Sequence, residues 1–496
     1  MFVIRLMQIK KYILFVFTFL ISAGLFAQYE VNNNCLNAWE ALTDLRVNTA
    51  RQLVANEIRQ NPDNYYAYYL DQMCDAYALA INGSQEMYYQ FVVDFEYRRE
   101  IMDEKDTKSP YYLACQSEMF LHMAAFGVMY GDRFSGVRKG FKSYKKIKEN
   151  VELFPGFATS KKLEGFFNIA ISNLPPFIQW AAGALGVSGD RQKGFDLLYE
   201  YFESVKDKKG LNAEAALFIM LSYKLNKEPV KAFDFIKAKD SSITRQRIVK
   251  YFYANTAYRS GNNDIAYESI ASFEPENAEV VFIPYDYMIG KILLRKLDDK
   301  AAYHFKRYLD LNKKDSYIKE ISYKLGLTYL VKNDVRQFNY YREQSCDNGD
   351  DVNERDREAI YDCELDYTPD VTLTKCKLLL EGGYHERFTE EFIAYHFNIS
   401  LPLPYQLEYY LLKARHEEFL GNKHLAEESY KTVINSGRDE DYYFASEAAM
   451  RLGLMMIESN REKAIKYLEL ARDLYDSDYY EYIDEIAKRE LKILDE

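Results

Sequence analysis

The hydrophobic pattern of this chain is helical along nearly its whole length, and the helices come in pairs. Apolar residues recur three and four positions apart between short turns that contain Gly, Asn or Pro, which is the pattern of amphipathic helices. One motif returns several times: a helix rich in Leu, Tyr and Ala, a Gly or Asn turn, and a second helix with an Ala near its start. It occupies residues 218–233, 252–270, 321–338, 409–430 and 448–468.

The spacing of these motifs identifies the type of repeat. The turn residues Asn226, Gly261 and Asn333 are 35 and 72 positions apart, and Gly421 and Asn460 are 39 apart. These intervals match tetratricopeptide-type helical hairpins of about 34 residues with insertions. Only 11 prolines and 22 glycines occur in 496 residues, which favours helices over sheets. We therefore predict an all-α fold, a tetratricopeptide-like α-α superhelix of antiparallel helical hairpins.

One stretch, residues 165–198, interrupts the repeats. A helix that begins near Ala158 should end at Ser172, because the following Asn-Leu-Pro-Pro sequence removes N–H donors and disfavours helical backbone. A second, mostly apolar helix around Trp180 then leads to a turn at 186–190. Asp190 is placed to cap a third helix that starts at Arg191. We expect a buried, non-repeat hairpin; an anion site at Asp190 and Arg191 is the less favoured alternative to a cap with an ion pair.

This stretch resembles a known family. The pattern GxFN..(I/L)S.LPP, a short apolar helix and G.SGDR..G(F/L).LL is similar to the hallmark of the tetratricopeptide repeat protein 39 family, which includes fungal inclusion-body-clearance proteins of the mitochondrial outer membrane. The resemblance extends from about residue 110 to the C-terminus and is clear at both ends. It implies an all-helical adaptor or clearance factor without a known catalytic centre. The residues it marks as structural are Gly165, Asn168, Ser172, Pro175, Pro176, Gly189, Asp190, Arg191 and Gly194.

The N-terminus reads as an export signal. Residues 1–27 combine a basic start (Arg5, Lys10, Lys11) with an apolar run that ends at the small residue Ala27. That run is short for a membrane span, and the first cysteine, Cys35, is not at the expected cleavage point of a lipoprotein. We expect an exported protein, periplasmic or associated with the outer envelope, with no membrane span once the signal is removed.

Charge excludes one class of partner. The chain carries −12, to which the leader contributes +3, so the remainder carries −15. No basic patch stands out beyond the solvated run 142–148, so nucleic acid is not an expected partner.

The repeat rhythm breaks once more, at 346–372, where an acidic, turn-rich segment begins at Cys346. We predict an N-terminal repeat region at 28–345, this acidic irregular segment, and C-terminal repeats at 373–496, most simply as one continuous solenoid. The acidic residues Asp347, Asp350, Asp351, Glu354 and Asp356 lack the spacing of a calcium loop. The six cysteines allow disulfides in an oxidising compartment or small buried hydrophobic residues, and the sequence leaves both open.

No residue constellation indicates catalysis, a metal or another cofactor. The six histidines form no H-E-x-x-H pair, and no P-loop or G-x-S-x-G motif is present. We therefore predict a non-enzymatic scaffold or adaptor that binds a protein or peptide segment. The alternative is a nutrient-uptake-type protein that captures a glycan or small ligand on aromatic side chains. The predicted groove residues are tyrosines on the first helices of the repeats: Tyr253, Tyr258, Tyr323, Tyr329, Tyr409 and Tyr410.

Overall fold

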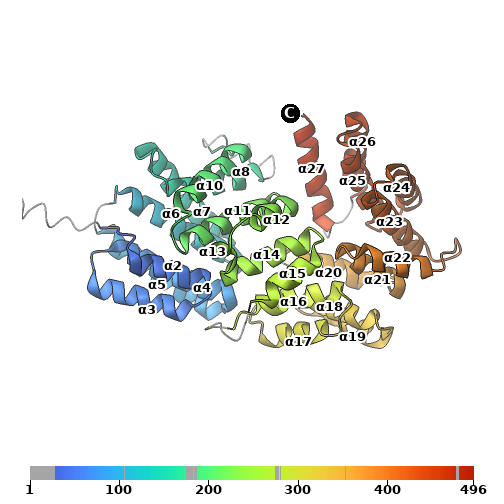
Figure 1. Ribbon diagram of the computed structural model, residues 1–496, viewed down its shortest axis with the longest axis horizontal. Coiled ribbons are helices and arrows are strands. Elements are labelled where there is room, and N and C mark those ends of the chain that lie inside the picture. The colour runs from blue at the N-terminus through green and yellow to red at the C-terminus, as the bar shows by residue number, and fades with distance from the viewer. Residues whose placement is uncertain are drawn as a thin grey trace, which may run out of the picture. The chain divides into compact units, whose positions relative to one another are not determined.

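The computed structural model describes residues 28–104, 107–174, 183, 187–273, 279, 281–351, 353–475 and 480–495. The export signal, Pro175, Pro176 and the segment with Trp180 lie outside the described residues. Within them every regular element of secondary structure is a helix, and Figure 1 shows the helices coloured in chain order. The chain forms two compact units: unit 1 is Met1–Phe252 with Glu274–Val281, and unit 2 is Tyr253–Phe273 with Phe282–Glu496. This division does not coincide with the acidic segment 346–372.

Unit 1 contains the N-terminal helical pairs and the α8–α10 pair that carries most of the hallmark residues. Its helices are α2 (Asn33–Thr43), α3 (Val47–Gln60), α4 (Tyr65–Asn82), α5 (Gln85–Asp103), α6 (Pro110–Met129), α7 (Arg133–Leu153), α8 (Ser160–Ser172), α10 (Arg191–Val205), α11 (Leu211–Leu225), α12 (Pro229–Lys237) and α13 (Ser241–Thr244). Helix α14 (Arg247–Arg259) begins in unit 1 and ends in unit 2.

Unit 2 consists of successive antiparallel hairpins and a closing helix. Its helices are α15 (Asn263–Ala271), α16 (Pro284–Arg295), α17 (Ala301–Leu311), α18 (Ile318–Leu330), α19 (Val335–Asp347), α20 (Glu354–Glu364), α21 (Val371–Glu381), α22 (His385–Ala394), α23 (Leu403–Phe419), α24 (Lys423–Gly437), α25 (Phe444–Met456), α26 (Arg461–Asp473) and α27 (Glu481–Asp495). The packed pairs α16–α17, α18–α19, α21–α22, α23–α24 and α25–α26 confirm the tetratricopeptide-like hairpins that the periodicity predicts.

Several of the hairpin turns contain a residue with left-handed backbone conformation. Gly261, Asn333 and Gly421, three of the predicted turn residues, have positive φ angles of 74°, 65° and 79°. A left-handed residue just past a helix end lets the chain reverse while the last carbonyls keep hydrogen-bond partners. In the turn at Asn226 the following residue, Lys227, takes this conformation instead. Asn460 has a different role, since its side chain caps α26 by accepting a hydrogen bond from the N–H of Lys463.

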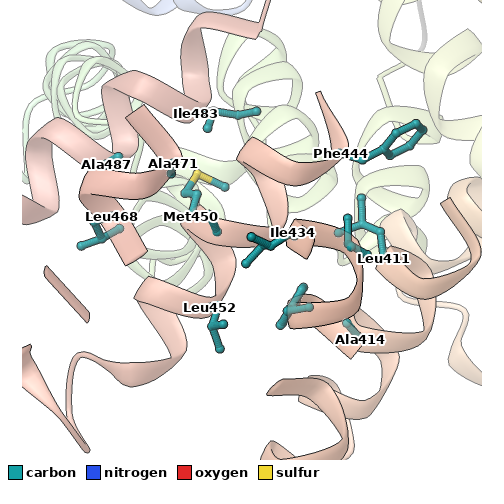
Figure 2. Close-up of a cluster of buried hydrophobic side chains, with 14 of the residues drawn as sticks. Leu411, Ala414, Ile434, Phe444, Met450, Leu452, Leu468, Ala471, Ile483 and Ala487 are labelled. Carbon is teal, nitrogen blue, oxygen red and sulfur yellow. The ribbon is translucent and has the colours of Figure 1, made fainter. Parts of the chain in front are cut away.

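Small residues let paired helices approach closely, as the sequence predicts. Ala414, Ala426 and Ala464 are all completely buried. Figure 2 shows the resulting C-terminal core, in which α23 to α27 contribute Leu411, Ile434, Phe444, Leu452 and Leu468 among other apolar side chains. Each hairpin thus buries its apolar face on the next, which is how repeat proteins are stabilised.

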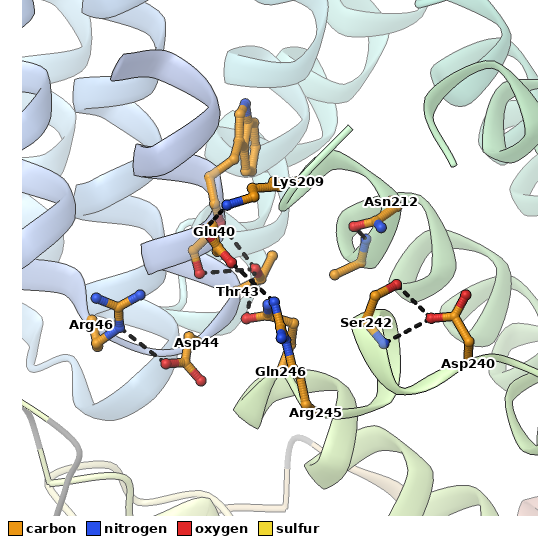
Figure 3. Close-up of polar contacts among 12 residues, drawn as sticks. Glu40, Thr43, Asp44, Arg46, Lys209, Asn212, Asp240, Ser242, Arg245 and Gln246 are labelled. Carbon is orange, nitrogen blue, oxygen red and sulfur yellow. Dashed lines mark hydrogen bonds and ion pairs between the residues drawn. The ribbon is translucent and has the colours of Figure 1, made fainter. Parts of the chain in front are cut away.

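In unit 1, the first helix is joined to residues about 200 positions further along the chain. Thr43 donates a hydrogen bond to Gln246 (3.4 Å), and Asp44 forms an ion pair with Arg247 (3.0 Å). Glu40 lies 3.4 Å from Arg245 and 3.7 Å from Lys209, as Figure 3 shows. The end of α2 is therefore fixed to the segment just before α11 and to the junction between α13 and α14.

The acidic segment is ordered and partly helical. Helix α20 lies within it, and a disulfide joins Cys346 to Cys363. Asp356 is fully buried and accepts hydrogen bonds from the backbone N–H groups of Tyr317 and Glu320 at the start of α18. Arg342 donates to the carbonyl oxygens of Cys363 (2.8 Å) and Tyr367 (3.1 Å). A buried carboxylate and an arginine thus supply hydrogen bonds to backbone groups in and beside this segment.

Candidate functional site

A set of charged side chains occupies one side of the first helices in unit 2, and we call it the charged face. Its members recur at helical spacing, so they project from the same side of each helix: Lys291 and Arg295 on α16, Glu320 and Lys324 on α18, Arg355, Glu358 and Asp362 on α20, Lys377 and Glu381 on α21, Glu408 and Arg415 on α23, and Glu447 and Arg451 on α25. Ion pairs, hydrogen bonds and electrostatic interactions link each helix to the next.

One end of the charged face is an arginine held by an aromatic ring and a carboxylate. The guanidinium carbon of Arg295 lies 3.5 Å from the ring centroid of Tyr258, and Nη2 is 3.3 Å from Glu381. Burial would raise the pKa of Glu381, but Arg295, Lys377 and Arg415 outweigh it and hold that pKa at about 2. Glu381 is therefore an anion at neutral pH.

Glu320 connects two lysines and a tyrosine. Lys291 Nζ lies 2.9 Å from Glu320 Oε1, Lys324 Nζ lies 3.7 Å away, and the hydroxyl of Tyr287 donates to Oε2 at 2.7 Å. The cations Lys291, Lys324 and Arg355 outweigh the effect of burial and lower the pKa of Glu320 to about 2. Because Lys291 is the more enclosed lysine and shares this single carboxylate, burial lowers its own pKa to about 7.

Two arginines near this group lie within electrostatic range of each other and differ in their ion pairs. Arg355 forms an ion pair with Glu358 (2.6 Å). Arg259, at the end of α14, has neither an ion pair nor a side-chain hydrogen bond within the described parts of the chain. Burial and the repulsion from Arg355 lower the pKa of Arg259, against the opposing effects of Glu354 and Glu358. Acids therefore lie within electrostatic range of Arg259, although none forms an ion pair with it in the described residues.

Further along lies a group of acids around Lys377. The ammonium of Lys377 donates to the hydroxyl of Tyr443 (3.2 Å), and Asp362 accepts a hydrogen bond from Tyr480 (2.8 Å). Burial raises the pKa of Asp362 against the opposing effects of Lys377 and Tyr480. Beyond them, Glu447 pairs with Arg451 (2.7 Å) and accepts from Tyr482 (3.2 Å). Glu408, between these groups, is 7% exposed, and burial raises its pKa to about 7.

Unit 1 holds a comparable but sealed cluster. Lys162 Nζ on α8 contacts Glu118 of α6 (2.8 Å) and Glu214 of α11 (2.5 Å), and all three side chains are at most 5% exposed. Tyr69 donates to Glu118 (2.7 Å) and Tyr201 to Glu214 (3.2 Å). Burial raises the pKa of Glu214 to about 7, whereas Lys162 lowers that of Glu118 in spite of burial. This cluster is built to hold helices together, since solvent hardly reaches it.

The six predicted groove tyrosines occupy different environments. Tyr258 lies at the charged face, beneath Arg295. Tyr253, on the same helix, is half-buried. Tyr323 is 6% exposed and packs edge-on against Phe338 in an apolar cluster.

The other three tyrosines pack on aromatic rings of their own hairpin or of the segment that precedes it. Tyr329 stacks on Tyr341 (centroids 5.6 Å apart), and Tyr409 stacks on Phe397 (4.2 Å) and on Phe392 (4.7 Å). Tyr410 meets Phe397 edge-on and lines a hollow of about 490 Å³ with residues of α23 and α24. The six side chains therefore do not make up one surface.

The hallmark residues that the structure describes meet at the crossing of α8 and α10. A Cβ atom on Gly165 would lie 2.7 Å from the carbonyl oxygen of Gly194, and one on Gly194 would lie 2.8 Å from that of Gly165. A Cβ on Gly189 would lie 2.6 Å from the carbonyl oxygen of Asn168. These glycines allow two helices and a loop to touch through their backbones.

Polar hallmark residues secure the same crossing. Asp190 caps α10 by accepting from the N–H of Lys193 (2.9 Å), as predicted. Ser172 donates to the carbonyl of Ile169 (2.8 Å). Arg191 forms its ion pair with Glu228 at the start of α12 (2.5 Å), so the ion pair expected at Asp190 and Arg191 involves a different acid.

Neither a metal cluster nor a membrane-spanning helix occurs in the described residues. No group of three or more His, Cys, Asp or Glu side chains there is arranged to hold a metal ion. No helix in that part of the chain is long and apolar enough to cross a membrane. Cys35, Cys74, Cys115 and Cys376 are buried thiols, while Cys346 and Cys363 form the disulfide.

Comparisons with known proteins identify no family. No family model matches the chain, and no curated protein matches it. Among solved structures, the human IFIT1 dimer with m7Gppp-AAAA is 14% identical with a TM-score of 0.32, covering 92% of this chain and 95% of that one. The APC/C hetero-tetramer Cut9–Hcn1 is 9% identical with a TM-score of 0.23, covering 93% and 97%. Neither structure is similar enough to indicate a function, and the family named from the hallmark residues stays a resemblance.

Proposed function

We propose that this chain is a non-catalytic helical-repeat scaffold that binds an extended segment of a partner protein along the charged face of unit 2. In stacked hairpins the first helices line the inner surface, which repeat proteins use for binding. The observation that carries the proposal is the placement of many charged groups on those helices, where burial makes them costly unless they are paired. A scaffold with no ligand to recognise gains little from such a surface.

The composition of the charged face favours a protein partner over nucleic acid. Cations and anions are interspersed along it in nearly equal number, with seven Lys or Arg and six Asp or Glu among its members. A surface that binds phosphate backbones needs a larger excess of Lys and Arg. Interspersed charges suit a polypeptide segment with side chains of both signs, and they fix its register.

We also propose that the protein acts outside the cytoplasm, in the cell envelope. The N-terminal sequence reads as an export signal. The disulfide between Cys346 and Cys363 supports the same conclusion, because such bonds persist in oxidising compartments. The family that the hallmark residues resemble includes mitochondrial proteins, and their roles do not apply to a protein in the cell envelope.

Site-specific photocrosslinking in the source cells tests the proposed surface. A photoreactive phenylalanine replaces Arg415, on the charged face, or Tyr340, which is 51% exposed on the second helix α19. We expect a discrete protein adduct from position 415 and none from position 340. The adduct should weaken at least tenfold when Lys324→Glu is added and persist with Lys431→Glu on α24. An adduct that is indifferent to Lys324→Glu, or equal labelling from both positions, would reject the charged face as the binding surface.

A second candidate function, glycan or small-ligand capture, has one observation in its favour. The hollow beside Tyr410 is lined by Lys413, Glu428, Ser429, Lys431, Thr432 and Leu425. An aromatic ring flanked by hydroxyl and charged groups can stack on a sugar and pair its hydroxyls. Glycan-array binding that disappears with Tyr410→Ala but survives Lys324→Glu would favour this function over the peptide scaffold.

A further inference from the structure

Glu408 differs from every other acid of the charged face because it lacks a donor. Glu320, Glu358, Asp362, Glu381 and Glu447 each accept a hydrogen bond or pair with a cation. Glu408 has no ion pair and no side-chain hydrogen bond in the described residues, although only 7% of the residue is exposed. Its carboxyl oxygens are not among the fully enclosed side-chain atoms that lack a hydrogen-bond partner, so some solvent reaches them. A largely buried carboxyl to which the described residues supply no donor is a position open to a ligand.

The fold supplies a nearby cation but does not bring it into contact. Lys377 on α21 lies in electrostatic range of Glu408, yet its ammonium bonds to the hydroxyl of Tyr443 and forms no ion pair within 4.0 Å in the described residues. The other charged groups with the largest effects on Glu408, which are Asp370, Asp362 and Glu381, are acids. The local charge around Glu408 is therefore negative, which attracts a further cation.

Tyrosines are among the other side chains that sense the charge of Glu408. Five tyrosines from α18, the segment before α21, the segment after α22, α23 and the start of α25 are within electrostatic range of its carboxyl: Tyr323, Tyr367, Tyr395, Tyr405 and Tyr443. Ring faces carry partial negative charge and attract ammonium and guanidinium groups, and a carboxylate among them adds a charge-assisted acceptor. This combination is selective for organic cations.

We propose that Glu408 and its surrounding tyrosines bind a lysine or arginine side chain of the partner segment. The inference rests on the proposed function and specifies the chemistry of one position in the partner. The incoming cation donates to the carboxylate that the fold leaves without a donor, and the rings cover its apolar stem. A neutral side chain of the same length leaves that carboxylate unsatisfied and binds less well.

Proton linkage supports the proposal and provides a readout. Burial and the acids Asp370, Asp362 and Glu381 outweigh Lys377 and raise the pKa of Glu408 to about 7. A bound cation favours the ionised carboxylate, so binding releases a proton from the fraction of molecules in which Glu408 is protonated. Since a pKa of about 7 makes the carboxylate roughly tenfold more populated at pH 8 than at pH 6, affinity for a cation should rise by about that factor.

Calorimetric titration of the full mature chain tests the assignment. The probes are Nα-acetyl-arginine methylamide, Nα-acetyl-lysine methylamide and the neutral citrulline analogue, each at pH 6 and pH 8. The wild-type protein should bind at least one cationic probe at least tenfold more tightly than citrulline, more tightly at pH 8, and with proton release. Glu408→Gln should lose this preference and the pH dependence. The matched control Glu469→Gln, at an exposed acid on α26, should keep both.

The outcomes separate this inference from the proposed function. Equal binding of cationic and citrulline probes, or a preference that survives in a folded Glu408→Gln variant, overturns the cation site. If the adduct at position 415 still forms and still depends on Lys324, the scaffold function stands without it. Cation binding at Glu408 with no adduct from the charged face would instead retain the site and reject the partner surface. Helical circular dichroism of each variant establishes that it is folded.

Discussion

The side-chain amide oxygen of Asn168 accepts a hydrogen bond from the backbone N–H of Asp190 (3.1 Å), while its amide nitrogen donates to the carbonyl of Glu164 (2.9 Å). Asn168 thereby ties the end of α8 to the residue that caps α10. The glycines around it bring the two helices into backbone contact. The hallmark residues are therefore adjacent in space for a structural reason, and substitutions there should affect stability rather than binding.

Gly194→Ala should destabilise unit 1. The new Cβ would lie 2.6 Å from Ile169 Cγ1 and 2.8 Å from the carbonyl oxygen of Gly165, so α8 and α10 would have to separate. Overpacking of this kind costs about 1–3 kcal/mol. Gly140→Ala on α7 is the control, because its Cβ meets only Ala124 Cβ at 3.7 Å, and an alanine in a helix interior is favourable. Thermal melts that rank the two variants equally would contradict close backbone contact at this crossing.

Lys162→Met should be far more damaging than Lys161→Met on the same helix. Removal of Lys162 leaves the buried carboxylates of Glu118 and Glu214 without their shared cation, and breaking such a group costs about 3–5 kcal/mol. Lys161 pairs with Glu200 at a surface where both side chains are well exposed, so its loss should cost less than about 1 kcal/mol. The deficit of Lys162→Met should shrink from pH 8 to pH 5, since acid neutralises the two carboxyls. Urea unfolding at both pH values measures this, and a deficit that does not depend on pH would count against the role of charge.

The disulfide should stabilise the segment around α20. It joins Cys346 and Cys363, which are 17 positions apart in the sequence, and closing a loop of that size is worth about 3 kcal/mol in the chain-entropy model. Peptide mapping of the unreduced, denatured chain should find an alkylated thiol at Cys35, Cys74, Cys115 and Cys376 and at no other cysteine. Reduction should lower the melting temperature of the wild-type protein and leave that of a Cys346→Ser, Cys363→Ser double variant unchanged. Alkylation of Cys346 without prior reduction would refute the pairing.

The sequence was sufficient for those features of the fold that depend on local chemistry. Hydrophobic periodicity predicted the paired helices, and the Gly and Asn positions predicted most of the turns. The cap at Asp190 was predictable because a helix N-terminus leaves N–H groups without partners whatever its tertiary surroundings. The order within 346–372 was not, because it depends on Asp356 reaching the start of α18, a contact that no local pattern specifies.

The candidate site was missed for a related reason. The sequence predicts tyrosines as the binding residues and does not single out Lys291, Glu320, Lys377 and Glu408. In the sequence these four look like ordinary solvated positions of amphipathic helices. A usable signal was present: a charged residue such as Lys291 or Glu408 stands within a run of apolar residues on a first helix. Which tyrosines would instead pack between helices depends on neighbours such as Phe397, beyond the reach of repeat spacing.

Glu408→Gln should change the way in which the stability of unit 2 depends on pH. Burial raises the pKa of Glu408 from an ordinary value near 4.5 to about 7, against the opposing effect of Lys377. A carboxyl with a raised pKa in the folded state contributes stability that is fully present below the unfolded pKa and is lost as pH rises through the folded pKa. Glutamine removes this loss. Relative to wild type, Glu408→Gln should therefore gain on the order of 1–3 kcal/mol between pH 5 and pH 8.

Chemical unfolding followed by helical circular dichroism at pH 5 and pH 8 measures that gain. Glu428→Gln, at an exposed acid of α24, should show no such change and serves as the control. A Glu408→Gln variant that is more destabilised at pH 8 than at pH 5 would show that the carboxylate already has a donor in the folded protein. The cation site would then lose its basis, because the charged face would contain no unsatisfied acid for a partner to complete.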